Sequence, residues 1–488
     1  MGSLLSPPEG RKSGLWFPVL TLLSAGVVGG VGATSTAAGI GLVLGPILLA
    51  AVFASPTLRL AVVVSGALIV FQSPSDRIKY SYIGLAFISV LVSCVELYRH
   101  QDDVRRAFRP MLVAGVLMTS LIAMSSFNAL TSGVTVDNWV RDMLAYLLCV
   151  TLPVVGLDAS RQLSPRTLAG IFFVVGVASS FAFASDWLNR RGAVEGLGRV
   201  LLASATLPML MLGYALVRAV TGPHRPRWTA VAVLIPVALL ITGTRTYLVV
   251  FFALTVGALG SRAKGRVPPL LMLRFLAVSG SLTAALVYLL ARDWLTNVGF
   301  VHGRVAVTLA ALSGHVSRDQ SFVARAQSYR LANATWHEHV WLGAGPGHLY
   351  PGGTFTMDTP LLVLAKFGLI GTVGIIVFMV CVCLSVARCQ LAPDAFYTAG
   401  RSWAFALVAL VPFGPWFEDK GTSLALALLV CATASVSYAR REGERPLAAL
   451  PRLPQVGDRD ADALVRVADR RTVDQEFSVS DRLEAKST

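Results

Sequence analysis

Long runs of apolar residues with few charged side chains recur along this chain up to about residue 439. A helix needs about 20 such residues to cross the apolar core of a bilayer. Because lipid cannot satisfy backbone amides, only helices or closed barrels cross it, and these runs show no strand-like alternation. Only 14% of the 488 residues are charged, against about 25% in soluble domains, which excludes a soluble enzyme, a disordered protein and a secreted disulfide scaffold.

The runs predict an all-α polytopic integral membrane protein with about 14 transmembrane helices, or about 12 if the two shortest runs do not cross. We expect spans near residues 16–33, 37–55, 59–73, 80–97, 110–129, 139–156, 167–184, 200–218, 228–243, 246–260, 269–290, 359–384, 402–415 and 421–438. The expected parts are N-terminal helices over 1–290, one long extracytoplasmic loop over 291–358, C-terminal helices over 359–439 and a tail over 440–488. The tail interleaves 10 basic and 10 acidic residues, which is typical of a disordered cytoplasmic extension.

The net charge of +15, from 42 basic and 27 acidic residues, could indicate nucleic-acid binding or membrane orientation. With the N-terminus inside, the inner connections hold 18 basic and 6 acidic residues, as the positive-inside rule requires. The surplus therefore orients the chain, with both termini in the cytoplasm and residues 291–358 outside. The bilayer is then a partner, and no nucleic-acid partner is expected.

The long connection, residues 291–358, differs from every other connection in length and composition. It holds three tryptophans and five of the seven histidines. Apolar residues at helical spacing between Val323 and His339 predict a helix lying against the mouth of the bundle. The glycine-rich segment "HVWLGAGPGHLYPGG", residues 339–353, follows. Taken alone it is a plain turn, and no GK[ST] follows to make it a phosphate-binding Walker loop. Its glycines are Gly343, Gly345 and Gly347, and His348 comes directly after them.

Four arginines fall on the expected outer side, where the positive-inside rule disfavours them: Arg141, Arg245, Arg325 and Arg330. Any one of them could be an interfacial side chain or part of a structural ion pair. Arg245 lies in a very tight turn between two apolar runs and has little loop to extend into. Guanidinium groups stay ionised and bind phosphate oxygens bidentately. Arginines that converge on one mouth would therefore suit a lipid-linked diphosphate.

Several residues around the next span could also carry chemistry. Asp358, at the outer edge, could be a general base, an ion-pair partner or a helix N-cap, and Pro360 favours the cap. Lys366 lies within the span, and the Gly368–Gly371 pair would let the helix pack closely against a neighbour. The histidines within 337–339 diverge on a helix, so we expect no metal and no cofactor.

The order of these elements resembles the O-antigen ligase/O-antigen polymerase superfamily of bacterial envelope glycosyltransferases. The resembling elements are the "GTR" turn at 243–245, Arg325, Tyr329, the "LGAGPG" of 342–347, and the segment from Asp358 to Gly371. The resemblance covers roughly residues 228–385. The N-terminal spans match only by hydropathy and by the pair Asp137–Arg141.

The resemblance implies a metal-independent inverting transferase on the outer side of the bacterial cytoplasmic membrane. Its donor would be a polyprenyl-diphosphate-linked glycan, and its acceptor a glycan or an envelope lipid or polymer. Carried over to this chain, Arg245 and Arg325 would bind the diphosphate, with Arg141 and Arg330 as further candidates. Ligases of this family have a His-Asn pair where this chain has Met357-Asp358. The base would then be Asp358 itself, or His348 reaching over from the glycine-rich segment.

Two alternatives come from other classes. A transporter or flippase for an anionic solute or a lipid-linked sugar would need polar residues deep in several spans, and Lys366 is the clearest of few. No pair of broken helices related by internal symmetry is visible in the sequence, which weakens this alternative. The other is a membrane scaffold whose function lies in the tail, and deleting residues 445–488 would abolish the function of such a scaffold.

Overall fold

The computed structural model describes residues 36–72, 76–100, 102–190, 206–221, 225–241, 246–260, 281, 320–351, 357, 359–389, 394–411, 414 and 418–448. The expected spans at 16–33 and 269–290, the start of the long connection and residues 449–488 lie outside the described residues, apart from residue 281. The chain divides into two compact units, Met1–Tyr438 and Ala439–Thr488, and each is described by itself.

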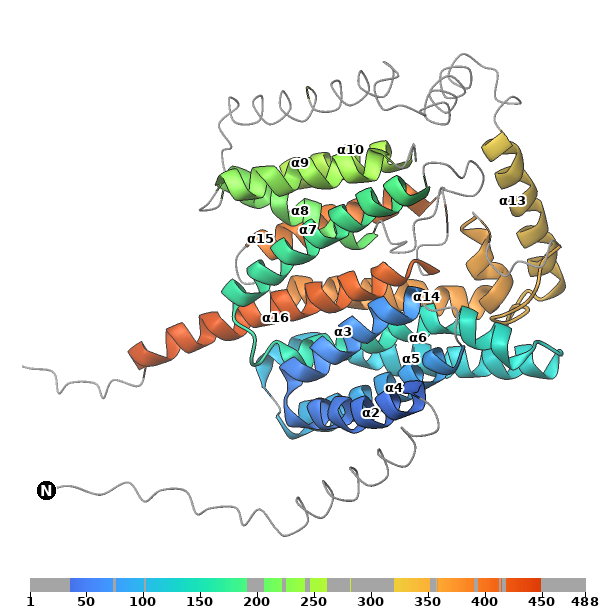
Figure 1. Cartoon of the computed structure of the whole chain (residues 1–488), viewed down its shortest axis with the longest axis horizontal. Coiled ribbons are helices and arrows are strands. Elements are labelled where there is room, and N and C mark those ends of the chain that lie inside the picture. The colour runs from blue at the N-terminus through green and yellow to red at the C-terminus, as the bar shows by residue number, and fades with distance from the viewer. Residues whose placement is uncertain are drawn as a thin grey trace, which may run out of the picture. The chain divides into compact units, whose positions relative to one another are not determined.

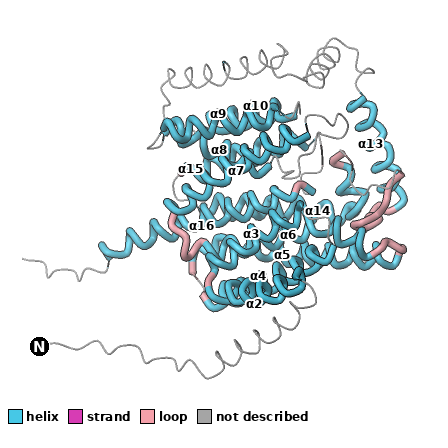
Figure 2. Tube along the Cα trace, viewed as in Figure 1, coloured by secondary structure: helices cyan, strands magenta, loops and turns pink. Residues whose placement is uncertain are grey.

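The described elements are α-helices, and the described ranges contain no strand (Figures 1 and 2). This confirms the all-α prediction. The helices are α2 (Thr36–Ala54), α3 (Pro56–Gln72), α4 (Asp76–Arg99), α5 (Asp103–Thr131), α6 (Val136–Ala159), α7 (Pro165–Arg190), α8 (Thr206–Thr221), α9 (Arg225–Ile241), α10 (Thr246–Gly260), α13 (Gln320–Glu338), α14 (Leu361–Cys389), α15 (Ala395–Leu410) and α16 (Lys420–Ala448).

Each expected span within the described residues overlaps a helix, but several helices begin earlier than the apolar runs. The side chain of Asp102 accepts a hydrogen bond from the backbone amide of Arg105 at 2.8 Å, so α5 begins at Asp103 and not near 110. Asp394 caps α15 in the same way, through the amide of Tyr397 at 2.8 Å. Polar caps therefore extend the helices beyond the residues that hydropathy marks.

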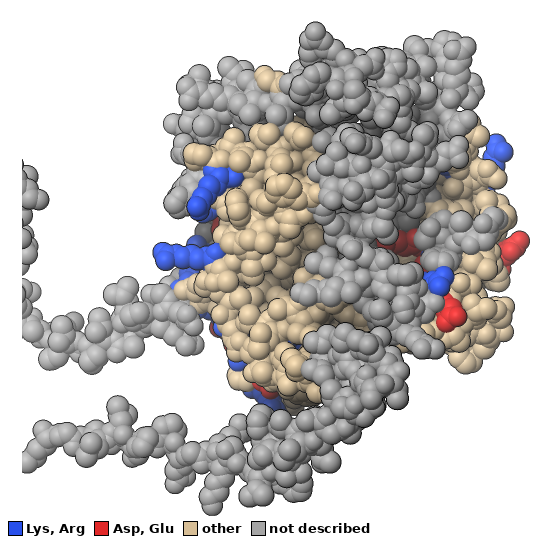
Figure 3. All heavy atoms as spheres, viewed as in Figure 1, with Lys and Arg blue, Asp and Glu red and all other residues tan. Residues whose placement is uncertain are grey.

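Five described helical segments are long and apolar enough to cross a membrane: Tyr80–Arg99, Asp103–Thr131, Val136–Ala159, Leu361–Cys389 and Gly421–Arg441. Large apolar side chains on the outside of these segments stay exposed, such as Phe127 (73%) and Val116 (68%). Figure 3 shows one face on which the described surface is largely uncharged, with charged side chains towards its edges. Such a surface is suited to lipid and not to water.

Helices α6 and α16 are the most enclosed of these segments, with 89% and 78% of their apolar stretches buried. Small residues let neighbouring backbones approach closely, as expected where helices pack without a hydrophobic driving force. Gly156 on α6 lies so close to the carbonyl of Ala427 on α16 that an added Cβ would overlap it. Helix α5 packs along both α6 and α14, and α13 packs against α14 (Figure 1). The predicted helix of the long connection is therefore confirmed.

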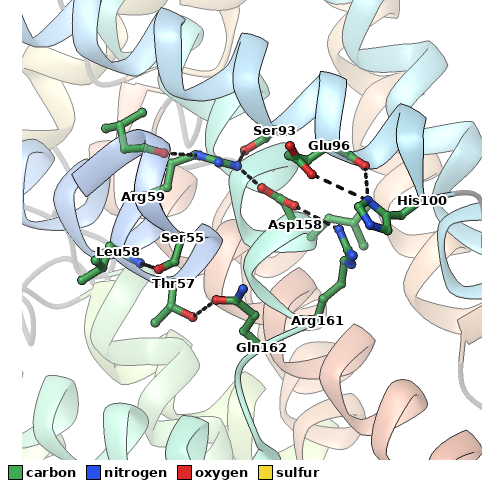
Figure 4. A network of polar contacts seen from close by, with 12 residues as sticks. Ser55, Thr57, Leu58, Arg59, Ser93, Glu96, His100, Asp158, Arg161 and Gln162 are labelled. Atoms are coloured by element: carbon green, nitrogen blue, oxygen red, sulfur yellow. Dashed lines mark hydrogen bonds and ion pairs between the residues drawn. The ribbon is translucent and has the colours of Figure 1, made fainter. Parts of the chain in front are cut away.

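A buried ion pair joins four of the N-terminal helices (Figure 4). Arg59 on α3 donates through Nε to the carbonyl of Val52 at 2.9 Å and through Nη1 to Ser93 Oγ on α4 at 3.0 Å. The same Nη1 contacts the carboxylate of Asp158 on α6. Both charged side chains are almost completely buried, at 2% and 0% exposure. Arg59 is one of the 18 basic residues counted above in the inner connections, but it is an interior residue of the helical bundle.

Candidate functional site

Helix α14 contains a break one to two turns from its start. Gly368 has φ 62° and ψ −167°, which no helical residue adopts. A break leaves backbone amides and carbonyls without intrahelical partners, and inside a bilayer each unsatisfied group costs several kcal/mol. The Gly368–Gly371 pair was expected to let the helix pack closely against a neighbour. Gly368 does allow a close approach, to the backbone of Trp341, but it also ends one helical segment and begins another. The short first segment carries Lys366.

The glycine-rich end of the long connection fills this break. We call residues 339–350 the glycine loop. Four backbone hydrogen bonds join it to α14: Leu369 N to Val340 O (2.8 Å), Ile370 N to Trp341 O (3.2 Å), Ala344 N to Ala365 O (2.8 Å) and Gly345 N to Lys366 O (2.9 Å). Asn128 on α5 adds a hydrogen bond to the carbonyl of Gly343 at 2.8 Å. The glycine loop therefore replaces the helical bonds that the break removes, and it is part of the bundle.

The glycines of the loop allow this close approach. Gly343, Gly345 and Gly347 have φ values of 70°, 90° and 84°, which side-chain-bearing residues rarely adopt. An added Cβ on Gly343 would overlap the carbonyl of Lys366, and one on Gly368 would overlap the carbonyl of Trp341. The two backbones thus contact each other directly at both glycines. The segment is not the plain turn that its sequence taken alone indicates.

Below the glycine loop lies a group of buried charges that we call the Lys366 cluster, comprising Lys366, Asp142, Glu418 and Tyr146. The ammonium of Lys366 donates to Asp142 Oδ1 on α6 at 2.6 Å and also to Glu418, in the turn before α16. Tyr146 donates to the same Glu418 oxygen at 2.7 Å. The other oxygen of Asp142 accepts the backbone amide of Gly347 at 2.6 Å. The cluster therefore joins three helical segments to the glycine loop.

The cluster holds one lysine against two carboxylates, so full ionisation would leave a buried charge of −1. Burial raises the pKa of Glu418, which lies outside the membrane-spanning segments; Lys366 opposes this shift and Asp142 adds to it. Two carboxylates that share one partner in a low-dielectric site favour retaining one proton between them. The raised pKa of Glu418 favours its protonated form, and protonation would remove the excess charge.

His348 and Tyr350 lie at the C-terminal end of the glycine loop. Their rings meet edge to face with centroids 5.1 Å apart. Tyr350 is 3% exposed, and its hydroxyl has no hydrogen-bond partner within the described part of the chain. His348 is half-buried, and burial lowers its pKa, with the neighbouring His339 and then Lys366 adding to the effect of burial while Glu338 opposes it. Its imidazole is therefore neutral near pH 7, as a proton acceptor must be.

The structure separates the candidate arginines of α13. Arg325 is half-buried and shares the covered face of the helix with Ser328 and the fully buried Ala332. Arg330 points away from that face and is exposed. Arg141 is exposed on α6, directly before Asp142 of the Lys366 cluster. Arg325 thus lies on the side of α13 that packs on its neighbours, and Arg330 does not.

The other two candidate residues, Arg245 and Asp358, lie outside the described residues. Sequence reasoning did not single out Asp142 and Glu418 as members of a site. A signal was available. Asp142 falls inside its expected span as Lys366 does, and Glu418 directly precedes the last one, so opposite charges occur near the ends of three apolar runs. Intramembrane charges of opposite sign usually pair.

The fold and the site define a multi-pass α-helical membrane protein with a glycine loop inserted into a broken helix above a buried charge cluster. The chain matches no known protein family, and no curated protein matches it. What the site can do chemically follows from its groups. A neutral imidazole can accept a proton, and fixed guanidinium groups can neutralise an anionic leaving group.

Proposed function

We propose that this chain is a membrane glycosyltransferase of cell-surface polysaccharide synthesis. It would transfer a glycan from a polyprenyl diphosphate to a glycan or envelope acceptor on the outer side of the cytoplasmic membrane. The observation that carries the proposal is the insertion of the glycine loop into the break of α14. The loop holds His348 in one place, next to a helix whose covered face bears Arg325. Transfer between two bound substrates needs such fixed groups.

The proposed reaction is a substitution at the sugar carbon attached to the diphosphate. A base, His348 or Asp358, takes the proton of the acceptor hydroxyl while its oxygen bonds to that carbon. The bond from the carbon to the diphosphate oxygen breaks, and the diphosphate leaves with the bonding electrons. Arg245 and Arg325, with Arg141 as a further candidate, would stabilise the charge that grows on the leaving group. Arg330, on the exposed face of α13, has the weakest geometric support of the four arginines.

The contacts fit the alternation of spans on which the proposed orientation, with both termini cytoplasmic and the site facing outward, is based. Charges that the positive-inside rule assigns to one face contact each other, as Arg59 and Asp158 do. Residues assigned to the opposite face also meet, as Gly347 and Asp142 do. An error in the alternation of the spans would have separated these pairs.

The arginine substitutions test the proposed transfer directly. Arg325→Ala and Arg245→Ala are each expected to reduce transfer about 100-fold, as loss of one preorganised stabilising group does elsewhere. The measurement is the rate of glycan transfer by the purified full-length chain in a bilayer, with a lipid-diphosphate-linked oligosaccharide as donor. Arg330→Ala is the matched control, and it should retain transfer within about threefold of the unaltered chain, because Arg330 lies on the exposed face of the helix and not on the face that bears Arg325. Full transfer by the Arg245→Ala/Arg325→Ala double variant would refute the proposal.

The pH dependence of transfer distinguishes the two candidate bases. Because burial lowers the pKa of His348 from its ordinary value of 6.5, transfer should persist on acidification to below pH 6.5 and fall only when the imidazole becomes charged. His348→Gln should lower the rate at neutral pH about 100-fold, the lower end of general-base contributions, and abolish that acidic decline. A His348→Gln variant with an unchanged rate and pH profile would assign the role of base to Asp358.

A second function is favoured by one specific observation. The buried Lys366 cluster and the break in α14 are features that transporters use for binding anionic solutes or coupling ions near broken helices. A transporter or flippase for a lipid-linked sugar would therefore also use this site. The transfer assay separates the two functions, because a transporter moves its substrate across the bilayer without forming a glycosidic bond.

A further inference from the structure

We propose that Asp142, Lys366 and Glu418 form a clamp that fixes the glycine loop in the break of α14, and that they are positioning residues for His348. The inference rests on the proposed transferase function only where it predicts a change in the rate of glycan transfer. The clamp concerns only how the glycine loop is held in place, and this can be tested without any substrate.

Asp142 connects the loop to the helix through both of its carboxylate oxygens. One accepts the amide of Gly347 at 2.6 Å, directly before His348, and the other accepts the ammonium of Lys366 at 2.6 Å. Lys366 in turn contacts the loop through its own backbone, because its carbonyl accepts the amide of Gly345 at 2.9 Å. A closed circuit of hydrogen bonds therefore runs from the loop through α6 and α14 and back to the loop.

Two further contacts, from Ser125 and from Glu418, keep this circuit of hydrogen bonds in one arrangement. Ser125 on α5 donates to the carbonyl of Lys366 at 3.1 Å, so the same carbonyl is held from a third helix. Glu418 also accepts a hydrogen bond from the ammonium and is itself held by Tyr146. A long lysine side chain has many rotamers in isolation. Two acceptors on different segments leave it one position.

The charges of the cluster are better explained by positioning than by stability. Buried ion pairs are often no more stabilising than well-packed apolar residues of the same volume, but they can specify a single geometry. Removing one member leaves a buried charge without its partner, and displacement of the loop would admit the water that the charge requires. The side chain whose loss should release the loop most directly is Asp142, because it alone binds both the loop amide and the ammonium.

The test measures the loop and the reaction separately, using the purified full-length chain in a bilayer. Amide hydrogen exchange of the peptide covering residues 340–350 reports on the loop. In Asp142→Asn this exchange should accelerate at least tenfold, and kcat should fall at least tenfold with the KM for the donor within threefold. Glu418→Gln keeps the Lys366–Asp142 pair and still offers the ammonium an amide oxygen, so both measurements should change in the same direction as in Asp142→Asn but by a smaller factor. Tyr350→Phe removes a buried hydroxyl without a described partner and is the matched control.

The exchanged pair Asp142→Lys/Lys366→Asp distinguishes a clamp from a purely structural ion pair. It restores opposite charges across α6 and α14, but a lysine at position 142 cannot accept the amide of Gly347. Loop exchange should therefore stay fast and kcat low. The clamp would be overturned if the Asp142→Lys/Lys366→Asp variant recovered slow amide exchange of the loop and a normal kcat. It would also be overturned if amide exchange of the loop were unchanged in Asp142→Asn. Faster loop exchange in Asp142→Asn, in a chain that shows no transfer at all, would leave the clamp standing and refute the proposed function.

Discussion

Arg59→Met is expected to lower the free energy of unfolding by about 3–5 kcal/mol, the usual effect of removing one partner from a buried ion pair. Asp158 would remain as a carboxylate with 0% side-chain exposure. Its second neighbouring cation, Arg161, lies 3.9 Å away at the edge of the bundle and replaces Arg59 poorly. The measurement is denaturant-induced unfolding of the purified chain in detergent micelles, followed by tryptophan fluorescence.

The control for Arg59→Met is Arg106→Met, which breaks a pair that is exposed at both ends. Arg106 and Asp103 have exposures of 74% and 59% and lie 3.1 Å apart, so the expected change is below about 1 kcal/mol. Adding Asp158→Leu to Arg59→Met removes the orphaned charge and should restore more than half of the lost stability. If Arg59→Met and Arg106→Met were equally stable, the interior placement of Arg59 would be wrong.

The helices of this chain could be predicted from sequence because the bilayer imposes one simple requirement. An apolar run of sufficient length must satisfy its own backbone, and the helix is the way to do so. Hydropathy places these runs well, but it cannot see polar residues that extend a helix. Asp102 and Asp394 begin α5 and α15 outside the apolar runs because their side chains satisfy free backbone amides.

The candidate site could be predicted only in part, because its members come from distant parts of the chain. The glycine loop and Lys366 are visible as local features of the sequence. Asp142 and Glu418 contact Lys366 because the segments that carry them are neighbours in the fold. A single sequence carries little information on which helices are neighbours. Arg59 shows the opposite error. A rule about charge sign treats every basic residue near a helix end alike, whereas burial decides whether it orients the chain or joins helices.

Gly343→Ala is the second substitution with a large expected effect. Two costs combine at this position. A side chain at φ 70° costs about 1–2 kcal/mol, and the added Cβ would overlap the carbonyl of Lys366. The overlap involves backbone on both sides, so no side chain can rotate away, and the loop must move out of the break. Loss of the two nearest loop-to-helix hydrogen bonds would add about 0.5–1.5 kcal/mol each. We therefore expect the free energy of unfolding to fall by about 2–5 kcal/mol in total.

Gly133→Ala separates these two costs, because Gly133 also has a positive φ, of 88°, but no atom lies within 4 Å of its added Cβ. In Gly133→Ala the free energy of unfolding should fall only by the conformational cost of the positive φ, about 1–2 kcal/mol. The additional loss of stability in Gly343→Ala then measures how much the contact between the glycine loop and α14 contributes to the free energy of unfolding. Since the loop lies at one end of the bundle, exchange in residues 340–350 should rise before the helices unfold. Equal losses in the two variants would mean that the loop does not occupy the break.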